Sequence, residues 1–168
     1  MRYVTTRQAL TSKGWMADIQ IAIGADGRIA AIGPATHPTD HQIDVALPAP
    51  TNLHSHSFQR AMAGLTEMRG PDPTDSFWTW RRLMYRFLDQ LTPDQIEVIA
   101  AQVFMEMLEA GYCAAVEFHY LHHGVGGVPY DNPSELSQRH VAAAQTVGIG
   151  LSHLPVLYQF GGCDGRTL

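Results

Sequence analysis

The stretch NLHSHSFQRAMAGL, residues 52–65, places His54 and His56 two positions apart, directly behind an apolar, proline-containing lead-in. If a β-strand ends here, side chains two residues apart point to the same face, so the two imidazoles converge while Ser55 points away. Neutral imidazole is a preferred zinc ligand, and a catalytic zinc keeps one position open for water. A bare His-x-His also occurs among ordinary core and surface histidines, so the surrounding sequence must decide.

The residues on either side of this stretch differ in their patterning. Before it, ADIQIAIG (17–24) alternates apolar and polar residues, and ADGRIAAIG (25–33) places a hairpin turn at Asp26-Gly27 ahead of a second strand. This pattern predicts a small β unit that ends near residue 46. From about residue 52 onward strands alternate with helices, as in parallel βα units. The histidine pair would then lie at the carboxyl end of a strand, where (β/α)₈ barrels carry their sites.

The clearest helix is expected over residues 92–111. Thr92 can cap its N-terminus, Pro93 suits the first helical position, Gln95 completes a capping box and Gly111 can close the C-terminus. Apolar residues at three- and four-residue spacing predict one buried stripe, formed by Ile96, Ile99, Ala100, Val103, Met107 and Leu108.

Four further elements complete the alternation after residue 52. They are a shorter helix over 76–88, a buried strand over 112–120, a helix capped by Asn132 and ending at Gly148, and a strand over 149–158. In the helix capped by Asn132, Pro133 is expected at the first helical position. The order suits the opening of a (β/α)₈ barrel or a doubly wound sheet.

The whole chain of 168 residues is 45% hydrophobic and 16% charged, with a net charge of −5 and no polybasic run. These values predict a globular protein with no nucleic acid and no membrane as partner. The N-terminus lacks the apolar core of a signal peptide, and no segment has the ~18 apolar residues of a membrane span, so a cytoplasmic location is expected. The two cysteines are too few for a disulfide framework, and Cys113 is expected in the core.

Five of the nine histidines fall in two tight groups, and clustering is what a metal site requires. The first group is His54 with His56. The second is His119, His122 and His123, at the end of the strand expected over 112–120, and it is a competing place for a metal.

Several longer segments resemble a known family. ADIQIAIGADGRIAAIG, followed by a proline-containing turn and His-x-His, is similar to the opening of the amidohydrolase superfamily, which comprises metal hydrolases on a (β/α)₈ barrel with an attached β-sandwich. More narrowly, NLHSHSFQRAMAGL, DSFWTWRRLMYRF and EMLEAGYCAAVEFHYLHH resemble the formimidoylglutamate deiminases of histidine degradation. The resemblance runs through essentially the whole chain. It implies one Zn²⁺ per active site and hydrolysis of N-formimidoyl-L-glutamate to N-formyl-L-glutamate and ammonia.

The resemblance also implies roles for individual positions. His54 and His56 would be two zinc ligands, and Gln59, Arg81 and Tyr120 match positions that hold the substrate. A guanidinium such as Arg81 suits a carboxylate, and this small-molecule substrate has two. The residues alone favour a solvated helix charge for Arg81 and an ordinary strand-end aromatic for Tyr120. They also do not distinguish Arg81 from its neighbour Arg82.

Other positions receive no role from the resemblance. The family draws no zinc ligand from the group formed by His119, His122 and His123. Glu117 lies at odd spacing from Tyr120, so the two side chains face opposite sides of the strand, and its role stays open. The third zinc histidine, the catalytic histidine and the proton-handling aspartate of the family lie further along, so no catalytic residue is identified in this chain.

The expected architecture is therefore α/β and incomplete. Residues 1–50 would form part of a β-sandwich, and residues 51–168 the N-terminal part of the barrel. A complete (β/α)₈ barrel takes roughly 250 residues, so only about three of its βα units can be present. The chain is expected to bind zinc weakly and to be inactive alone, and the enzyme is expected to form a homodimer.

Two alternatives remain at this point. One is another deaminase of the amidohydrolase superfamily, acting on a nucleobase or a triazine ring, which would need the barrel opening but not a carboxylate-binding Arg81. The other is a non-catalytic remnant module. In either case, the first and third strands of an incomplete barrel would offer unpaired edges and favour association.

Overall fold

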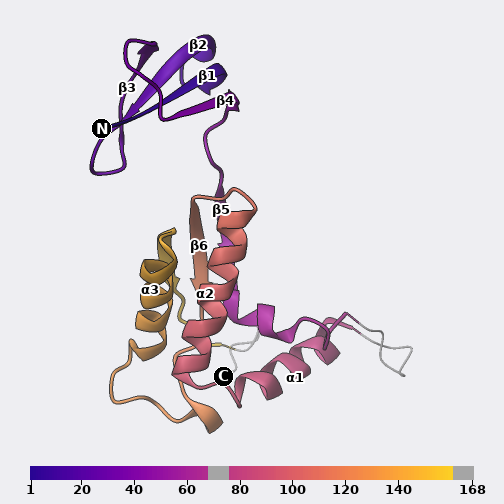
Figure 1. Cartoon of the computed structure of the whole chain (residues 1–168). Coiled ribbons are helices and arrows are strands. Elements are labelled where there is room, and N and C mark those ends of the chain that lie inside the picture. Colours follow the sequence, from indigo (N-terminus) through magenta and orange to yellow (C-terminus); the bar gives the residue numbers. More distant parts are fainter. Residues whose placement is uncertain (68–75, 161–168) are drawn as a thin grey trace. The chain divides into compact units, whose positions relative to one another are not determined.

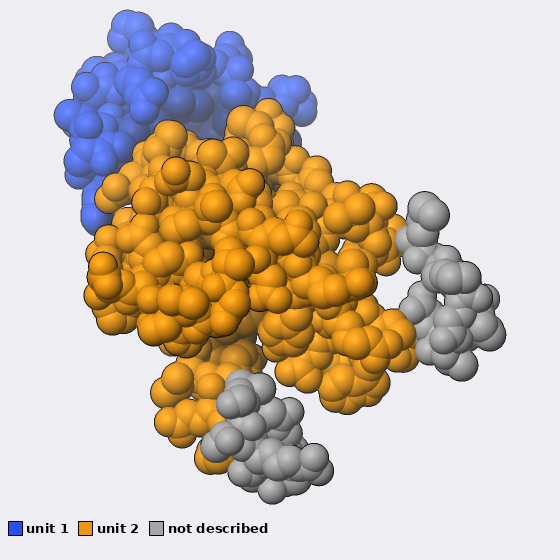
Figure 2. Space-filling view, turned by 90° about the horizontal axis from the view of Figure 1, so that it is seen from below, with its two compact units in different colours: residues 1–49 blue, residues 50–168 orange. Residues whose placement is uncertain are grey.

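The computed structural model describes residues 1–67 and 76–160, so Cys163 lies outside the described residues. The chain divides into two compact units, Met1–Ala49 (unit 1) and Pro50–Leu168 (unit 2), which are coloured separately in Figure 2. Each unit carries its own sheet, and the chain as a whole is mixed α/β, as predicted. Among the described residues, no helix combines the length and the apolar character needed to cross a bilayer.

Unit 1 contains a four-stranded sheet in the order β3-β2-β1-β4, formed by β1 (Arg2–Thr11), β2 (Gly14–Ile23), β3 (Ile29–Pro34) and β4 (His41–Ala46). β2 pairs antiparallel with β1 and β3, whereas β4 pairs parallel with β1. The predicted turn at Asp26-Gly27 is confirmed: Gly27 has φ 77°, and the Asp26 carboxylate accepts from Arg28 N at 3.1 Å. The second layer of a sandwich stays a prediction.

Unit 2 contains a parallel sheet in the order β5-β6-β7, formed by β5 (Thr51–Ser55), β6 (Ala114–His119) and β7 (Gly150–Pro155). Between β5 and β6 run a 3₁₀ helix η1 (Ser57–Met62) and the helices α1 (Phe77–Leu88) and α2 (Pro93–Glu109). A short 3₁₀ turn η2 (Val125–Gly127) and α3 (Glu135–Val147) connect β6 to β7. α2 and α3 pack side by side and cover one face of the sheet (Figure 1).

Local sequence signals set the ends of α2. Gln95 N donates to Thr92 Oγ1 at 3.3 Å, and Thr92 N donates to Gln95 Oε1 at 2.9 Å, which completes the predicted capping box. Beyond the last helical turn, Gly111 adopts φ 92°, a conformation in which glycine carries no Cβ penalty.

The start of α3 differs from the prediction. The N-cap is Ser134 rather than Asn132, and the helix begins at Glu135, after Pro133 rather than with it. Asn132 Oδ1 accepts from Ser134 N at 3.1 Å and from Ser134 Oγ at 2.8 Å, so Asn132 closes a turn ahead of the helix. The predicted C-terminus is confirmed, with Gly148 at φ 83°.

The core of unit 2 lies between the sheet and the helices α2 and α3. Phe104 and Ala100 of α2 are fully buried and pack in one cluster with Ala115 of β6 and Ala143 of α3. Two predictions of burial, for Leu108 and Cys113, are wrong. Leu108 is 36% exposed, and Phe104, one helical turn earlier, occupies the core instead. Cys113 is also exposed, since it precedes the first residue of β6.

Candidate functional site

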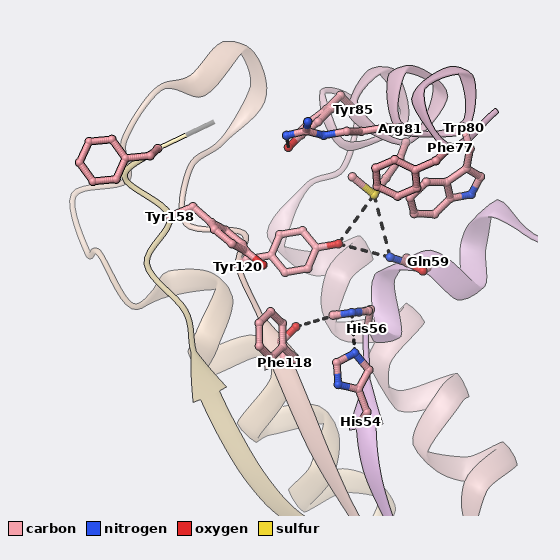
Figure 3. Close-up of a pocket in the computed structure, with 12 residues that line it drawn as sticks. His54, His56, Gln59, Phe77, Trp80, Arg81, Tyr85, Phe118, Tyr120 and Tyr158 are labelled. Carbon is pink, nitrogen blue, oxygen red and sulfur yellow. Dashed lines mark hydrogen bonds between the residues drawn. The ribbon is translucent and has the colours of Figure 1, made fainter. Parts of the chain in front are cut away.

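The predicted histidine pair comes together at the carboxyl end of β5. The Nε2 atoms of His54 and His56 lie 3.0 Å apart, and the two rings meet edge to face with centroids 4.6 Å apart. His56 Nδ1 lies 2.9 Å from the backbone oxygen of Phe118 on β6 (Figure 3). Because a carbonyl oxygen only accepts, His56 donates from Nδ1, and its Nε2 lone pair is directed toward His54.

An irregular strand end positions this pair. β5 pairs with β6 at Thr51↔Ala114 and Asn52↔Ala115 and next at Ser55↔Glu117, so β5 carries one extra residue between the last two pairs. His54 lies in this bulge. The strand ends at Ser55, and His56, with φ −129° and ψ 76°, is the N-cap of η1. The two imidazoles therefore converge through a bulge followed by a turn.

The histidine pair fits a zinc ion. A tetrahedral zinc with Zn–N distances of about 2.0–2.1 Å holds two ligand nitrogens about 3.3 Å apart, close to the 3.0 Å between these two Nε2 atoms. A hydrogen bond from Nδ1 to a backbone carbonyl, as in His56, is the usual way in which proteins orient a metal-bound histidine. Over residues 1–67 and 76–160, no group of three His, Cys, Asp or Glu side chains could hold a metal ion. Within the described part of the chain, His54 and His56 are therefore a pair without a third candidate ligand beside them.

Both histidines line an open cleft of about 620 Å³, a size suited to a small molecule. All five residues singled out from the sequence line this cleft. Among the described residues, the lining consists of His54, His56, Gln59, Phe77, Trp80, Arg81, Met84, Tyr85, Phe118, Tyr120, Tyr158 and Phe160. In Figure 3 the histidine pair lies at one end of the cleft, and Arg81 and Tyr85 of α1 lie at the other.

Gln59 and Tyr120 lie between these two ends (Figure 3). Gln59 Nε2 donates to Tyr120 Oη at 3.3 Å, and the Tyr120 ring meets His56 edge to face with centroids 5.2 Å apart. Burial raises the pKa of the Tyr120 hydroxyl above its ordinary value, and the hydrogen bond from Gln59 offsets part of the rise. The hydroxyl therefore stays protonated at neutral pH and can donate to a bound molecule.

The structure distinguishes Arg81 from its neighbours. Arg81 is the only arginine or lysine among the described residues that line the cleft, whereas Arg82 is exposed and does not line it. Arg81 donates to Tyr85 Oη at 3.2 Å, and its guanidinium carbon lies 5.7 Å from the centroid of the Trp78 ring. Arg60, next to Gln59 in sequence, instead forms a bidentate ion pair with a glutamate of α2. Arg81 is therefore the cation available to an anionic ligand.

The second histidine group does not join the cleft. His119 is buried on the face of β6 that packs against the helices, and its ring contacts His122, with centroids 5.2 Å apart. His122 Nε2 lies 2.8 Å from the backbone oxygen of Val156, and His123 is exposed. Glu117 shares the buried face with His119, opposite Tyr120, as its spacing predicted.

Sequence reasoning missed the aromatic wall of the cleft. Phe77, Trp80 and Tyr85 of α1 lie on the same side of that helix as Arg81. Their three- and four-residue spacing is visible in FWTWRRLMY and marks one helical face. The contribution of Tyr158, which follows β7, carries no such signal.

Comparisons with known proteins show which chains this one is similar to. A family model described as "Formimidoylglutamate deiminase HutF, N-terminal domain" matches residues 1–41. Formimidoylglutamate deiminase of Pseudomonas aeruginosa is 49% identical over 168 aligned residues, which cover 99% of this chain and 37% of that enzyme. The chain therefore spans little more than a third of the length of this relative.

Solved structures of amidohydrolases match the fold of this chain. The crystal structure of an amidohydrolase from Brucella melitensis matches with a TM-score of 0.92 and 44% identity, and covers 100% of this chain and 38% of that protein. A crystal structure of the atrazine chlorohydrolase TrzN from Arthrobacter aurescens TC1, complexed with zinc and atraton, matches with a TM-score of 0.76 and 19% identity, over 100% of this chain and 39% of that protein. The chain therefore has the fold of the matching part of these amidohydrolase structures.

The particular relative is then defined by the sequence match. This chain is similar over its whole length to the N-terminal part of formimidoylglutamate deiminase, which confirms the resemblance noted in the sequence.

Proposed function

We propose that this chain is the N-terminal part of a zinc-dependent hydrolase that converts N-formimidoyl-L-glutamate to N-formyl-L-glutamate and ammonia in histidine degradation. Its two units would be part of a β-sandwich and the first strands of a (β/α)₈ barrel. The observation that carries the proposal is a single cleft with two convergent imidazoles at one end and one guanidinium at the other. This layout suits a substrate that has a hydrolysable C–N bond at one end and carboxylates at the other. A cytoplasmic location and a homodimer are part of the same proposal.

Each residue of the cleft has a distinct task in this proposal. His54 and His56 hold the zinc, which when bound would lower the pKa of a water molecule and make it a nucleophile. Arg81 binds a substrate carboxylate through charge-assisted hydrogen bonds. Gln59 and Tyr120, already linked at 3.3 Å, orient the middle of the substrate between these ends. We place the third histidine ligand, the catalytic histidine and the aspartate in the remainder of the enzyme, and we assign no catalytic residue here.

The first test uses the chain itself. With two zinc ligands, the isolated chain should bind zinc weakly and release no ammonia from N-formimidoyl-L-glutamate. Isothermal titration calorimetry with zinc and an ammonia assay measure both properties. Tight stoichiometric zinc binding, or turnover by this chain alone, would contradict the division of the site that we propose.

The second test restores the missing part. A chimera in which this chain replaces the matching N-terminal part of the Pseudomonas aeruginosa enzyme should hydrolyse N-formimidoyl-L-glutamate, and His54→Ala should abolish both its zinc content and its activity. A chimera that carries zinc but is inactive on this substrate would refute the assignment.

The rival function is deamination of a nucleobase or a triazine ring, and the likeness to atrazine chlorohydrolase TrzN makes it specific enough to test. Such substrates carry no carboxylate for Arg81 to bind. In the chimera, Arg81→Ala should raise KM for N-formimidoyl-L-glutamate by about 10- to 100-fold, because a charged hydrogen bond worth about 1.5–3 kcal/mol is lost. Arg82→Ala is the matched control and should leave KM unchanged. Equal effects of the two substitutions would contradict the role of Arg81 as the carboxylate-binding residue.

A further inference from the structure

A buried polar network lies directly behind the histidine pair, on the opposite face of β6 from the cleft. Glu117 is 1% exposed, and its Oε1 accepts two hydrogen bonds from Ser57, from the backbone N at 2.8 Å and from Oγ at 2.9 Å. Ser57 is the residue that follows His56. His140 of α3, which is fully buried, places Nε2 3.0 Å from Ser57 Oγ and 3.5 Å from Glu117 Oε1.

The hydrogen-bond roles in this network are mutually consistent. His140 Nδ1 lies 2.9 Å from the backbone oxygen of Leu136, which can only accept. Ser57 Oγ gives its single proton to Glu117, so it must accept from His140 Nε2. His140 Nδ1 thus donates to Leu136, and its Nε2 faces both Ser57 Oγ and Glu117 Oε1, whereas Glu117 Oε2 is buried without a hydrogen-bond partner among the described residues.

The network is placed where the sheet itself gives least support. Regular ladder pairing of β5 with β6 is interrupted between Asn52 and Ser55, and His56 lies beyond the strand. The ladder resumes at Ser55, opposite Glu117, but pairs neither His54 before it nor His56 after it. Beyond Ser55, this segment is held to β6 by the bonds from Ser57 to Glu117 and by the contact of His56 Nδ1 with Phe118 O.

We propose that Glu117 is a positioning residue: through its two bonds to Ser57 it fixes the segment that carries His54 and His56, so that both imidazoles point at one metal ion. This inference rests on the proposed zinc site. Glu117 does not touch the cleft and takes no part in the chemistry. Its place inside an otherwise apolar strand, where a charge is costly to bury, follows from this task.

Two substitutions at one position separate positioning from mere burial. Glu117→Met removes both acceptor oxygens at similar size, whereas Glu117→Gln keeps an oxygen that Ser57 can reach. Val103→Ala, which truncates a core residue of α2 outside the network, is the control for general loss of stability.

Two readouts on the 168-residue chain report on the metal and on the geometry. The first is the affinity for Co²⁺, followed by its visible absorption, as a probe of the zinc site. The second is nuclear magnetic resonance, which gives hydrogen exchange of the Ser57 amide and the ring-to-ring NOE between His54 and His56.

Glu117→Met should weaken Co²⁺ binding about tenfold, accelerate exchange at Ser57 and abolish the NOE. The Co²⁺ affinities of Glu117→Gln and Val103→Ala should stay within about twofold of the affinity of the parent chain. Parent-like affinity and exchange in Glu117→Met would overturn the inference, and so would a loss of equal size in Val103→Ala.

Two further outcomes are also decisive. If Glu117→Met does not fold, as judged by circular dichroism, Ser57→Ala takes its place; it deletes one of the two bonds and should weaken Co²⁺ binding about threefold, and an unchanged affinity would overturn the inference. If the parent chain binds no Co²⁺ at all, the proposed zinc site fails. The role of Glu117 is then judged on the Ser57 exchange and the NOE alone, and their persistence in Glu117→Met rejects it.

Discussion

Lowering the pH should destabilise unit 2 through protonation of His119, before the carboxylates of this unit begin to titrate. This histidine is 2% exposed, and its ring lies 4.7 Å from that of His140 and 4.8 Å from that of His153, measured between centroids. Its Nε2 is buried without a hydrogen-bond partner among the described residues. Burial, reinforced by the charge of His140, lowers the pKa of His119 from 6.5 to about 3. His153 shifts in the same direction, again chiefly because of burial.

The sign and the size of the effect follow from proton linkage. The folded pKa of His119 lies below the unfolded one, so the unfolded chain binds more protons between pH 6.5 and about 3. The stabilisation is complete above pH 6.5 and is lost progressively as the pH falls toward 3. The slope reaches about 1.4 kcal/mol per pH unit below pH 6, so lowering the pH from 6.5 to 4.5 should cost about 2.3 kcal/mol of unfolding free energy.

This window excludes Glu117. Burial by itself raises the pKa of Glu117, but its hydrogen bonds with His140 and Ser57 and the charge of His140 outweigh burial and hold the pKa below 4.5. The stabilisation that Glu117 provides is therefore lost only at lower pH, as the carboxylate is protonated. Between pH 6.5 and 4.5 the slope reports on the histidines.

Urea unfolding at micromolar concentration, followed by circular dichroism at several pH values between 4.5 and 7.5, measures the slope. His119→Leu should flatten it by about 1.4 kcal/mol per pH unit. Ala143→Gly is the control, because it destabilises α3 in the same core without removing a titrating group and should keep the parent slope. An unchanged slope in His119→Leu would show that His119 is not held neutral by burial, and the reasoning would be wrong.

Two other properties of the chain can be predicted from the fold. Phe104→Ala should lower the unfolding free energy by about 3–5 kcal/mol, because Phe104 is fully buried between α2, α3 and β6; a urea midpoint within experimental error of the parent would contradict its place in the core. The isolated chain should self-associate, because β5 and β7 are the edge strands of the parallel sheet and carry exposed Leu53 and Leu154; light scattering that shows a monomer at all concentrations would contradict this.

Local signals were sufficient for most of the elements. The ends of α2 follow from Thr92, Gln95 and Gly111, because capping involves only residues within one helical turn. The start of α3 was misplaced because Asn132 has the right side chain for a cap but uses it in the preceding turn. Which apolar residue of α2 fills the core, Phe104 or Leu108, depends on how the helix packs against α3 and β6. Spacing alone does not contain that information.

The site shows the same division between local and tertiary information. The sequence could not separate Arg81 from Arg82, because adjacent residues on a helix point about 100° apart and only the packing of α1 decides which one faces the cleft. The buried network around Glu117 was invisible for a related reason. Ser57 lies 60 residues before Glu117 and 83 residues before His140 along the chain. Only the parallel βα crossover brings the three residues together.

The histidine pair is the informative case, because the convergence was predicted from strand alternation but arises differently. Alternation alone would let a regular β5 present His54 and His56 on one face. The observed strand inserts an extra residue opposite β6 and ends before His56, so the two Nε2 atoms meet across a bulge and a turn. A regular ladder fixes its side chains through its own hydrogen bonds, whereas a bulge does not. An irregular strand end that must hold two rings 3.0 Å apart therefore needs support from outside the strand, and in this chain Glu117 and the backbone oxygen of Phe118 provide it.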